Sequence, residues 1–142
     1  MKTFKFDHDI RVFGTVVSTF PNGIGEAFDE IVKKLPGGFD RSFFGISMMT
    51  ADGIKYIAAA QEKYEGEGKL YGYDDFVIEK GNYATEEIKN WRSKTDSIKN
   101  IFEAMYKARQ DADTMKPCVE WYKSDEEMWC MIRLRSEKTV AK

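Results

Sequence analysis

Residues 117–135, PCVEWYKSDEEMWCMIRLR, decide the fold. Two runs rich in apolar and aromatic residues flank the polar stretch 124–127 (SDEE), which is the pattern of a β-hairpin. Glu120 interrupts the first run, between Val119 and Trp121. A carboxylate is costly to remove from water unless something compensates its charge. Glu120 is therefore either compensated by a partner or exposed at the surface.

Strand alternation puts Glu120 and Tyr122 on the same face of this hairpin. If residues 125–126 form a two-residue loop, Tyr122 faces Trp129 and Glu120 faces Met131. That register predicts one carboxylate on an aromatic and apolar face, which suits a flat or greasy cation. The alternative is an acid exposed on an edge strand, or one paired with a nearby lysine or arginine.

The length of 142 residues favours one domain with its own core. Charged residues make up 32% of the chain but are mixed in sign, and the formal net charge is −2, which argues against nucleic acid as a partner. No stretch approaches the roughly 20 apolar residues that span a bilayer, so no membrane association is predicted. The first residues lack the apolar core of a signal peptide, and we expect a cytoplasmic protein.

Metal and disulfide chemistry are not predicted. Cys118 and Cys130 are the two cysteines, and in the register above they point to opposite faces, so both are expected to be reduced. There is no CxxC motif and His8 is the single histidine, which argues against zinc. No cofactor is expected. Aromatic residues make up 14% of the chain, and with seven methionines they fit an adaptable apolar pocket.

The rest of the chain alternates between strand and helix patterns. A strand is expected over 10–20, an amphipathic helix over 24–35, a hairpin over 43–60 that turns at Asp52–Gly53, a loop at 65–69, a strand over 73–79 and a helix stripe at 98–105. One face of the first hairpin carries four small residues: Gly45, Ser47, Ala58 and Ala60. They either leave room for a ligand or allow close packing of a helix or loop. Residues 83–91 fit a strand or the start of a long helix.

An internal repeat decides that ambiguity. A shift of 73 positions places Ser47 on Glu120, Met49 on Tyr122 and Tyr56 on Trp129. The shift also places residues 12–19 of the first strand on 85–92, and residues 82–91 are therefore predicted to be a strand. We expect one α+β domain over residues 1–142, built from duplicated βαββ units at about 6–64 and 73–135. These units form one antiparallel sheet with two helices on one side and a pseudo-twofold groove, a natural ligand site.

Three segments carry a family resemblance: 12–14 (VFG), 77–84 (VIEKGNYA), and the hairpin 118–122 (CVEWY) with 130–134 (CMIRL). On these the chain resembles the GyrI-like small-molecule-binding domain, the effector-binding domain of AraC-type and MerR-type regulators. The resemblance covers about residues 6–135. Glu79 stands where the family commonly has proline. No helix-turn-helix segment accompanies the domain, so the stand-alone form is expected.

The resemblance implies a pocket on the pseudo-twofold axis for flat, lipophilic, often cationic compounds, whose charge meets an acid on the late hairpin. Glu120 matches that acid. The predicted ligand-binding residues are Glu120, Tyr122, Trp129, Tyr56, Met49 and Trp91. Trp91 has the alternative of being a core tryptophan.

Two other functions stay open. Some proteins of this kind resemble hydrolases of strained electrophilic natural products, in which case Glu120 acts as general base on a water molecule. The third possibility is a protein inhibitor of a larger enzyme such as a topoisomerase. If the chain is a small-molecule-binding domain, its expected partner is a small lipophilic or cationic molecule.

Overall fold

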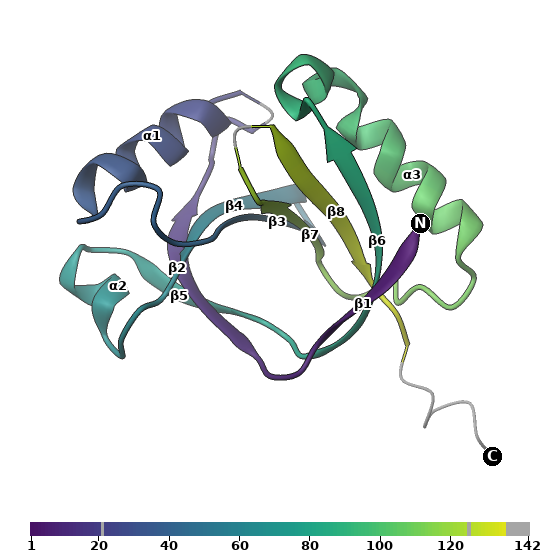
Figure 1. Ribbon diagram of the computed structural model, residues 1–142, viewed down its shortest axis with the longest axis horizontal. Coiled ribbons are helices and arrows are strands. Elements are labelled where there is room, and N and C mark those ends of the chain that lie inside the picture. Colours follow the sequence, from purple (N-terminus) through teal and green to yellow (C-terminus); the bar gives the residue numbers. More distant parts are fainter. Residues whose placement is uncertain (21, 125, 136–142) are drawn as a thin grey trace.

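The fold was determined from a computed structural model that describes residues 1–20, 22–124 and 126–135. Over these residues eight antiparallel strands form one curled sheet, accompanied by three α-helices (Figure 1). In chain order the elements are β1 (Lys2–Phe6), β2 (Ile10–Val16), α1 (Ile24–Lys34), β3 (Phe43–Thr50), β4 (Gly53–Gln61), α2 (Glu67–Leu70), β5 (Asp74–Ile78), β6 (Gly81–Lys89), a 3-10 helix η1 (Trp91–Ser97), α3 (Ile98–Ala108), β7 (Cys118–Tyr122) and β8 (Glu127–Arg133). The predicted α+β class is confirmed. The prediction of one domain over 1–142 extends to residues 136–142, outside the described ones.

The order of strands across the sheet is β1-β6-β8-β7-β3-β4-β2-β5. Exchanging each of β1–β4 with its counterpart in β5–β8 returns the same order read from the other end. The two halves are therefore arranged alike, with β3 and β7 at the centre. Each half contains four strands, one more than the expected βαββ unit. The additional strands are β1, which pairs with β6, and β5, which pairs with β2. The first strand of each half thus extends the sheet of the other half.

Both long helices cover the same face of the sheet, here called the outer face (Figure 1). On α1, Ile31 is fully buried against Ala58 and Ala60 of β4. Burying such a side chain stabilises the fold by about 1.5–3 kcal/mol. The lysines Lys33 and Lys34 end the helix, where positive charge suits the helix dipole.

The other face, here called the inner face, holds a second core. It contains Phe44, Ile57, Val119, Trp129 and Met131, all buried. The curl of the sheet in Figure 1 brings both of its ends toward this face. Alternate residues of each central strand are therefore buried on opposite sides, which is why these strands are apolar on both faces.

The first predicted hairpin is confirmed, although its turn is not where we expected it. The last pair is Thr50↔Gly53, so Ala51 and Asp52 form the turn in place of Asp52–Gly53. This moves each partner by two residues, and a shift of two keeps every side chain on its face. Ser47 now pairs with Tyr56 and remains on the outer face with it.

The predicted register of the second hairpin is wrong. Glu120 pairs with Cys130, and Tyr122 pairs with Met128. The predicted turn residue Asp125 lies outside the described residues, but an odd number of residues separates Tyr122 from Met128. A shift of one residue moves one strand's side chains to the other face. Trp129 therefore lies on the inner face, opposite to Glu120.

The same shift corrects the placement of the cysteines. Cys118 and Cys130 both lie on the outer face, and neither is in a disulfide. Burial raises the pKa of Cys118 to about 12 and also raises the pKa of Cys130. Both thiols are therefore neutral side chains of the core rather than reactive groups.

The strand predicted at 82–91 is present as β6, but it ends at Lys89, and Trp91 begins η1. The stretch expected to be a loop, 65–69, instead contains the start of α2. Glu67 of that helix is buried and accepts a hydrogen bond of 2.8 Å from Arg41. Neither Arg41 nor Glu67 stood out in the sequence, because both residue types are usually exposed.

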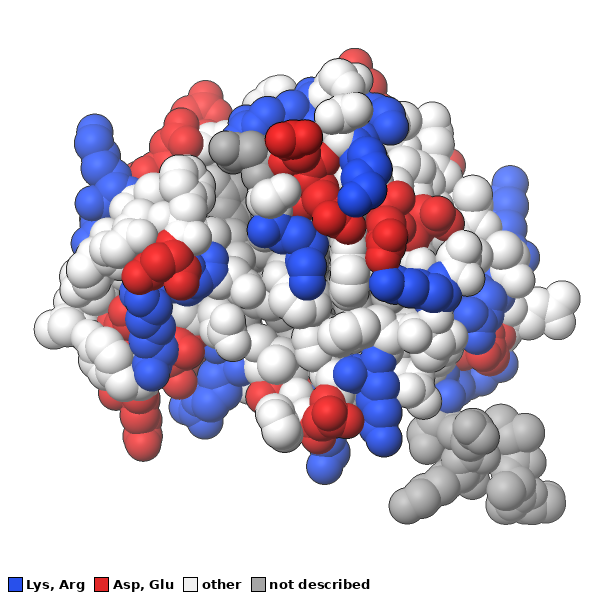
Figure 2. All heavy atoms as spheres, in the orientation of Figure 1, with Lys and Arg blue, Asp and Glu red and all other residues white. Residues whose placement is uncertain are grey.

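Two observations bear on partners. None of the helices in the described ranges is long and apolar enough to cross a membrane. On the face drawn in Figure 2, basic and acidic side chains are interspersed rather than gathered in one basic patch. That face lacks the positive surface that tracks a phosphate backbone.

Candidate functional site

Glu120 lies at the centre of the sheet. The ladder between the two central strands runs from Phe43↔Tyr122 to Ser47↔Cys118, and Gly45↔Glu120 is its middle pair. Alternation along β7 turns the Glu120 side chain to the outer face, the face covered by α1 and α3. The carboxylate therefore lies where the two halves of the chain meet.

Two tyrosine hydroxyls hold this carboxylate. Tyr56 of β4 donates a hydrogen bond of 2.7 Å to Glu120 Oε1, and Tyr122 of β7 donates one of 2.6 Å to the same oxygen. The two hydroxyl oxygens are 3.4 Å apart. Within the described residues, Glu120 makes no ion pair and Oε2 accepts no hydrogen bond. The half-buried carboxylate is thus fixed in position but has no cationic partner among the described residues.

Gly45 makes room for this arrangement. A Cβ atom at Gly45 would lie 2.0 Å from the Tyr56 hydroxyl and 2.6 Å from Glu120 Oε1. Real Cβ contacts are not this short, so any side chain here would push both groups away. Of the four small residues noted in the sequence, Gly45 opens space at the acid, whereas Ala58 and Ala60 allow close packing near α1.

Burial raises the pKa of Glu120 above its usual value, and the hydrogen bonds from Tyr122 and Tyr56 act in the opposite direction. Burial and the nearby carboxylate raise the pKa values of Tyr56 and Tyr122 well above 10.0. The two tyrosines therefore stay protonated at neutral pH and can donate hydrogen bonds to the carboxylate. A cation beside Glu120 would favour its ionised form and offset the cost of burying the charge.

Aromatic rings from the two helical connections cover the two tyrosines. Phe20 stacks on Tyr56 with ring centroids 5.1 Å apart and planes inclined by 9°. Trp91 lies edge-on to Tyr122 at 4.9 Å, and Phe28 of α1 approaches the same ring at 5.3 Å. The Trp91 indole donates a hydrogen bond of 2.9 Å to the carbonyl of Ser124.

Phe20 and Trp91 hold equivalent places in the two halves. Phe20 lies ten residues after the first residue of β2, and Trp91 lies ten residues after the first residue of β6. Each ring covers one of the two tyrosines that bind Glu120. We call Phe20 and Trp91 the covering rings.

The structure brings together four of the six predicted site residues: Glu120, Tyr122, Tyr56 and Trp91. Met49 lies on the same face but near the end of the hairpin, and it is 76% exposed. Trp129 is on the inner face, so its predicted place beside Glu120 was wrong. Phe20 and Phe28 were not among the site residues predicted from the sequence. A shift of 71 positions would have placed Phe20 on Trp91, whereas the shift of 73 did not.

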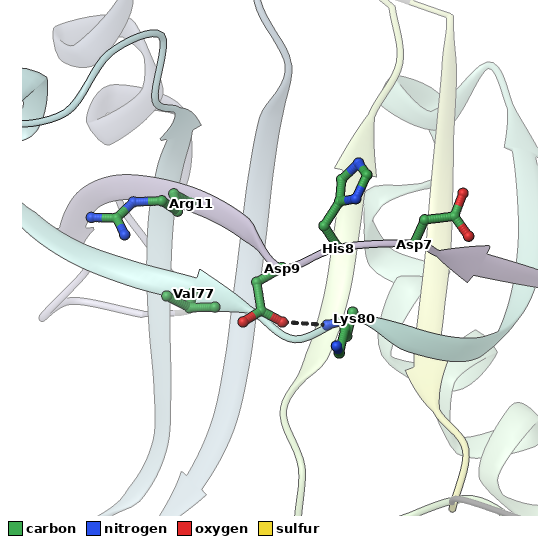
Figure 3. A pocket seen from close by; sticks show the side chains of 6 residues that line it. All are labelled: Asp7, His8, Asp9, Arg11, Val77 and Lys80. Carbon is green, nitrogen blue, oxygen red and sulfur yellow. Dashed lines mark hydrogen bonds between the residues drawn. The ribbon is translucent and has the colours of Figure 1, made fainter.

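A separate open hollow of about 530 Å³ lies where the β1–β2 and β5–β6 connections cross (Figure 3). The backbone N–H of Lys80 donates to Asp9 Oδ1 at 2.9 Å, which joins the two connections. The hollow shares no residue with the Glu120 cluster. It is lined by Asp7, His8, Asp9, Arg11, Val77 and Lys80. Since five of these side chains are polar or charged, the hollow is a poor match for a lipophilic ligand.

No group of three or more side chains that could hold a metal ion occurs in the part of the chain that the structure describes. The groups that the structure brings together at Glu120 are a carboxyl group, two phenols and aromatic rings.

No family model and no curated protein sequence matches the chain. Solved structures do. The structure of SAV2435 bound to tetraphenylphosphonium matches with a TM-score of 0.68 at 10% identity, over 99% of this chain and 96% of that one. An integron cassette protein from the mobile metagenome of Vibrio cholerae matches with a TM-score of 0.69 at 17% identity, over 94% and 95%. A candidate transcription regulation protein of Staphylococcus aureus MU50 matches with a TM-score of 0.58 at 12% identity, over 93% of this chain and 97% of that one. At these identities the likeness shows a shared fold.

Proposed function

We propose that this chain binds lipophilic cations that carry aromatic groups at Glu120, between its two halves, as a domain of the GyrI-like type. The observation that carries the proposal is the Glu120 carboxylate. It is held by two hydroxyls at the centre of the sheet, surrounded by rings, and has no cationic partner among the described residues. That SAV2435 has the same fold and binds tetraphenylphosphonium supports this choice of ligand class.

The rings determine which cations fit. Tyr56, Tyr122 and the covering rings offer aromatic faces, and a cation that carries aromatic groups can stack on them while its charge approaches the carboxylate. A small hydrated ion such as sodium lacks that stacking and would keep its water. Selectivity should therefore follow lipophilicity and positive charge together.

The covering rings close over the site, so a bulky ligand must displace them. Phe20 lies in the connection between β2 and α1, and Trp91 begins η1. Connections of this kind rearrange more readily than a sheet does. Binding thus requires the two rings to swing off Tyr56 and Tyr122 while the sheet that carries Glu120 stays in place.

The test is calorimetric titration with tetraphenylphosphonium and, as the matched probe, tetraphenylborate, which has the same shape and the opposite charge. We expect the cation to bind and the anion not to. Glu120→Gln should weaken cation binding by at least about tenfold, as expected for loss of a desolvated charge pair. Glu126→Gln, an exposed acid on the same hairpin, is the control and should change nothing. Equal binding of both probes, or full binding by Glu120→Gln, would contradict the proposal.

The raised pKa of Glu120 favours one second candidate, hydrolysis of a strained electrophile. A carboxylate whose pKa is raised is a stronger general base toward water, and the tyrosine hydroxyls beside it could donate to a developing anion. Incubation with a cyclopropane-bearing electrophile distinguishes the two. Hydrated product over many turnovers indicates an enzyme, whereas loss of one equivalent indicates binding alone. Inhibition of a larger enzyme stays a prediction.

A further inference from the structure

Glu120 and Trp121 are neighbours on β7, so their side chains leave opposite faces of the sheet. On the inner face Trp121 pairs with Trp129 across β7 and β8, with ring centroids 5.4 Å apart and planes inclined by 69°. Phe4 of β1 meets both indoles edge-on, at 5.8 and 5.3 Å. We call Phe4, Trp121 and Trp129 the aromatic corner.

The aromatic corner already holds an ammonium group. Lys123 Nζ lies 3.7 Å from the centroid of Trp121 and 4.2 Å from that of Trp129. Among the described residues no carboxylate forms an ion pair with Lys123, so the indole faces are what its charge contacts. Burial lowers the pKa of Lys123, although the residue remains exposed overall. Its side chain can therefore leave the corner without disturbing the core.

Carboxylates at the edge of the corner add to its preference for cations. Glu127 accepts a hydrogen bond of 3.0 Å from the Trp129 indole. Glu87 lies opposite Trp129 on β6 and binds Lys2 at 2.5 Å, which brings the Lys2 ammonium within 4.5 Å of the Trp129 ring. Two ammonium groups thus crowd one indole, and each raises the cost of keeping the other there.

We propose that the aromatic corner is a second cation site, for a small quaternary ammonium group of the choline class, and that Lys123 occupies it until such a ligand displaces it. Rings attract charge but accept no strong hydrogen bonds. A primary ammonium therefore loses its water contacts there without replacement, whereas a methylated ammonium has no N–H groups to satisfy. The site is on the opposite face of the sheet from Glu120, and the proposal does not depend on the function proposed above.

The experiment compares the wild type with Lys123→Ala, using choline and its neutral carbon analogue 3,3-dimethylbutan-1-ol. Removing the resident ammonium should strengthen choline binding by about tenfold, and the neutral analogue should bind neither protein. Glu120→Gln in the Lys123→Ala background should leave choline binding unchanged. Equal choline affinity in both proteins, no binding by either, or loss of binding with Glu120→Gln would overturn the proposal.

The three tryptophans supply a second readout in the same samples. Choline should shift the indole N–H resonances of Trp121 and Trp129 in nitrogen-15 spectra and leave that of Trp91, at the Glu120 site, in place. A shift confined to Trp91, or no shift at a choline concentration that saturates the titration, would overturn the assignment to the aromatic corner.

Discussion

Gly45 and Glu120 form the middle pair of the two central strands, and the absence of a side chain at Gly45 lets Tyr56 reach Glu120. We expect Gly45→Ala to destabilise the fold by about 1–3 kcal/mol, because the new methyl group overlaps the Tyr56 hydroxyl and the carboxylate. Chemical denaturation measures this loss. Gly25→Ala is the control, since no atom lies within 4 Å of a Cβ there and alanine favours the helix. Similar stability in the two variants would show that Gly45 does not make this room.

Each tyrosine hydroxyl should contribute separately to cation binding. Tyr122→Phe and Tyr56→Phe each remove one hydrogen bond to the ionised carboxylate, which raises the pKa of Glu120 further. We expect each variant to lose about 1 kcal/mol of binding free energy for tetraphenylphosphonium at neutral pH. Titration calorimetry checks this. Tyr106→Phe, on α3, is a matched tyrosine outside the site. If it weakened binding as much, the effect would not belong to the hydroxyls at Glu120.

The raised pKa of Glu120 predicts how stability depends on pH. The folded protein holds this proton more tightly than the unfolded chain does, so stability falls as pH rises from the unfolded value of 4.5 through the raised folded pKa. Each unit of increase corresponds to about 1.4 kcal/mol. Glu120→Gln keeps an acceptor for both tyrosines but lacks the titration. Its stability relative to the wild type should therefore grow across this pH window, as urea melts at several pH values will show. A constant difference would mean that the pKa is not raised.

Cation affinity should also depend on the ionisation of Glu120, but it should rise with pH where stability falls. A cation favours ionised Glu120, so ligand affinity should rise with pH through the folded pKa of Glu120 and level off above it. Proton release on binding, measured by calorimetry in buffers of different ionisation enthalpy, should disappear in Glu120→Gln. Release that persists in that variant would point to another titrating group.

The covering rings should control how fast a ligand enters. Trp91→Ala removes the ring over Tyr122 together with its hydrogen bond to Ser124, and Phe20→Ala removes the ring stacked on Tyr56. We expect both variants to associate with tetraphenylphosphonium faster than the wild type, because an opening step is removed. Stopped-flow fluorescence gives the rates. Unchanged association in both variants would indicate that the site is open without them.

The buried ion pair between Arg41 and Glu67 should matter for stability rather than for binding. Their side chains are 2% and 1% exposed and 2.8 Å apart. Removing one partner leaves the other charge buried, so Glu67→Ala should cost about 3–5 kcal/mol. The exposed pair Lys63–Asp40 is the control, and Lys63→Ala should have little effect on the thermal melt. A mild effect of Glu67→Ala would mean that water reaches Arg41.

The sequence predicted both hairpins, the helices α1 and α3 and a strand at 82–91 because apolar periodicity and turn residues act locally. It did not fix the hairpin registers, which depend on how many residues each loop uses. In the first hairpin the register error was two residues and did not change the predicted faces, because Tyr56 stayed on the face of Ser47. In the second the error was one residue, and it moved Trp129 to the other side of the sheet.

Glu120, Tyr122 and Tyr56 could be assigned to one site because alternation and the repeat both placed them on the same face. Phe20 could not, because the strand predicted over 10–20 ends at Val16, and the shift of 73 aligned Phe20 with Ser93 rather than with Trp91. The aromatic corner was hidden for a different reason. The expected register put the rings of Trp121 and Trp129 on opposite faces, whereas the observed one pairs them.

The place where a lipophilic cation binds can be measured in crystals soaked with tetraphenylarsonium, the heavy-atom analogue of tetraphenylphosphonium. Anomalous scattering from arsenic locates the cation without prior assumptions. We expect one strong peak on the outer face, over the Glu120 carboxylate and between the rings of Tyr56 and Tyr122, with Phe20 and Trp91 displaced. A peak confined to the hollow beside Asp9 and Lys80, or an unoccupied outer face at saturating ligand, would contradict it.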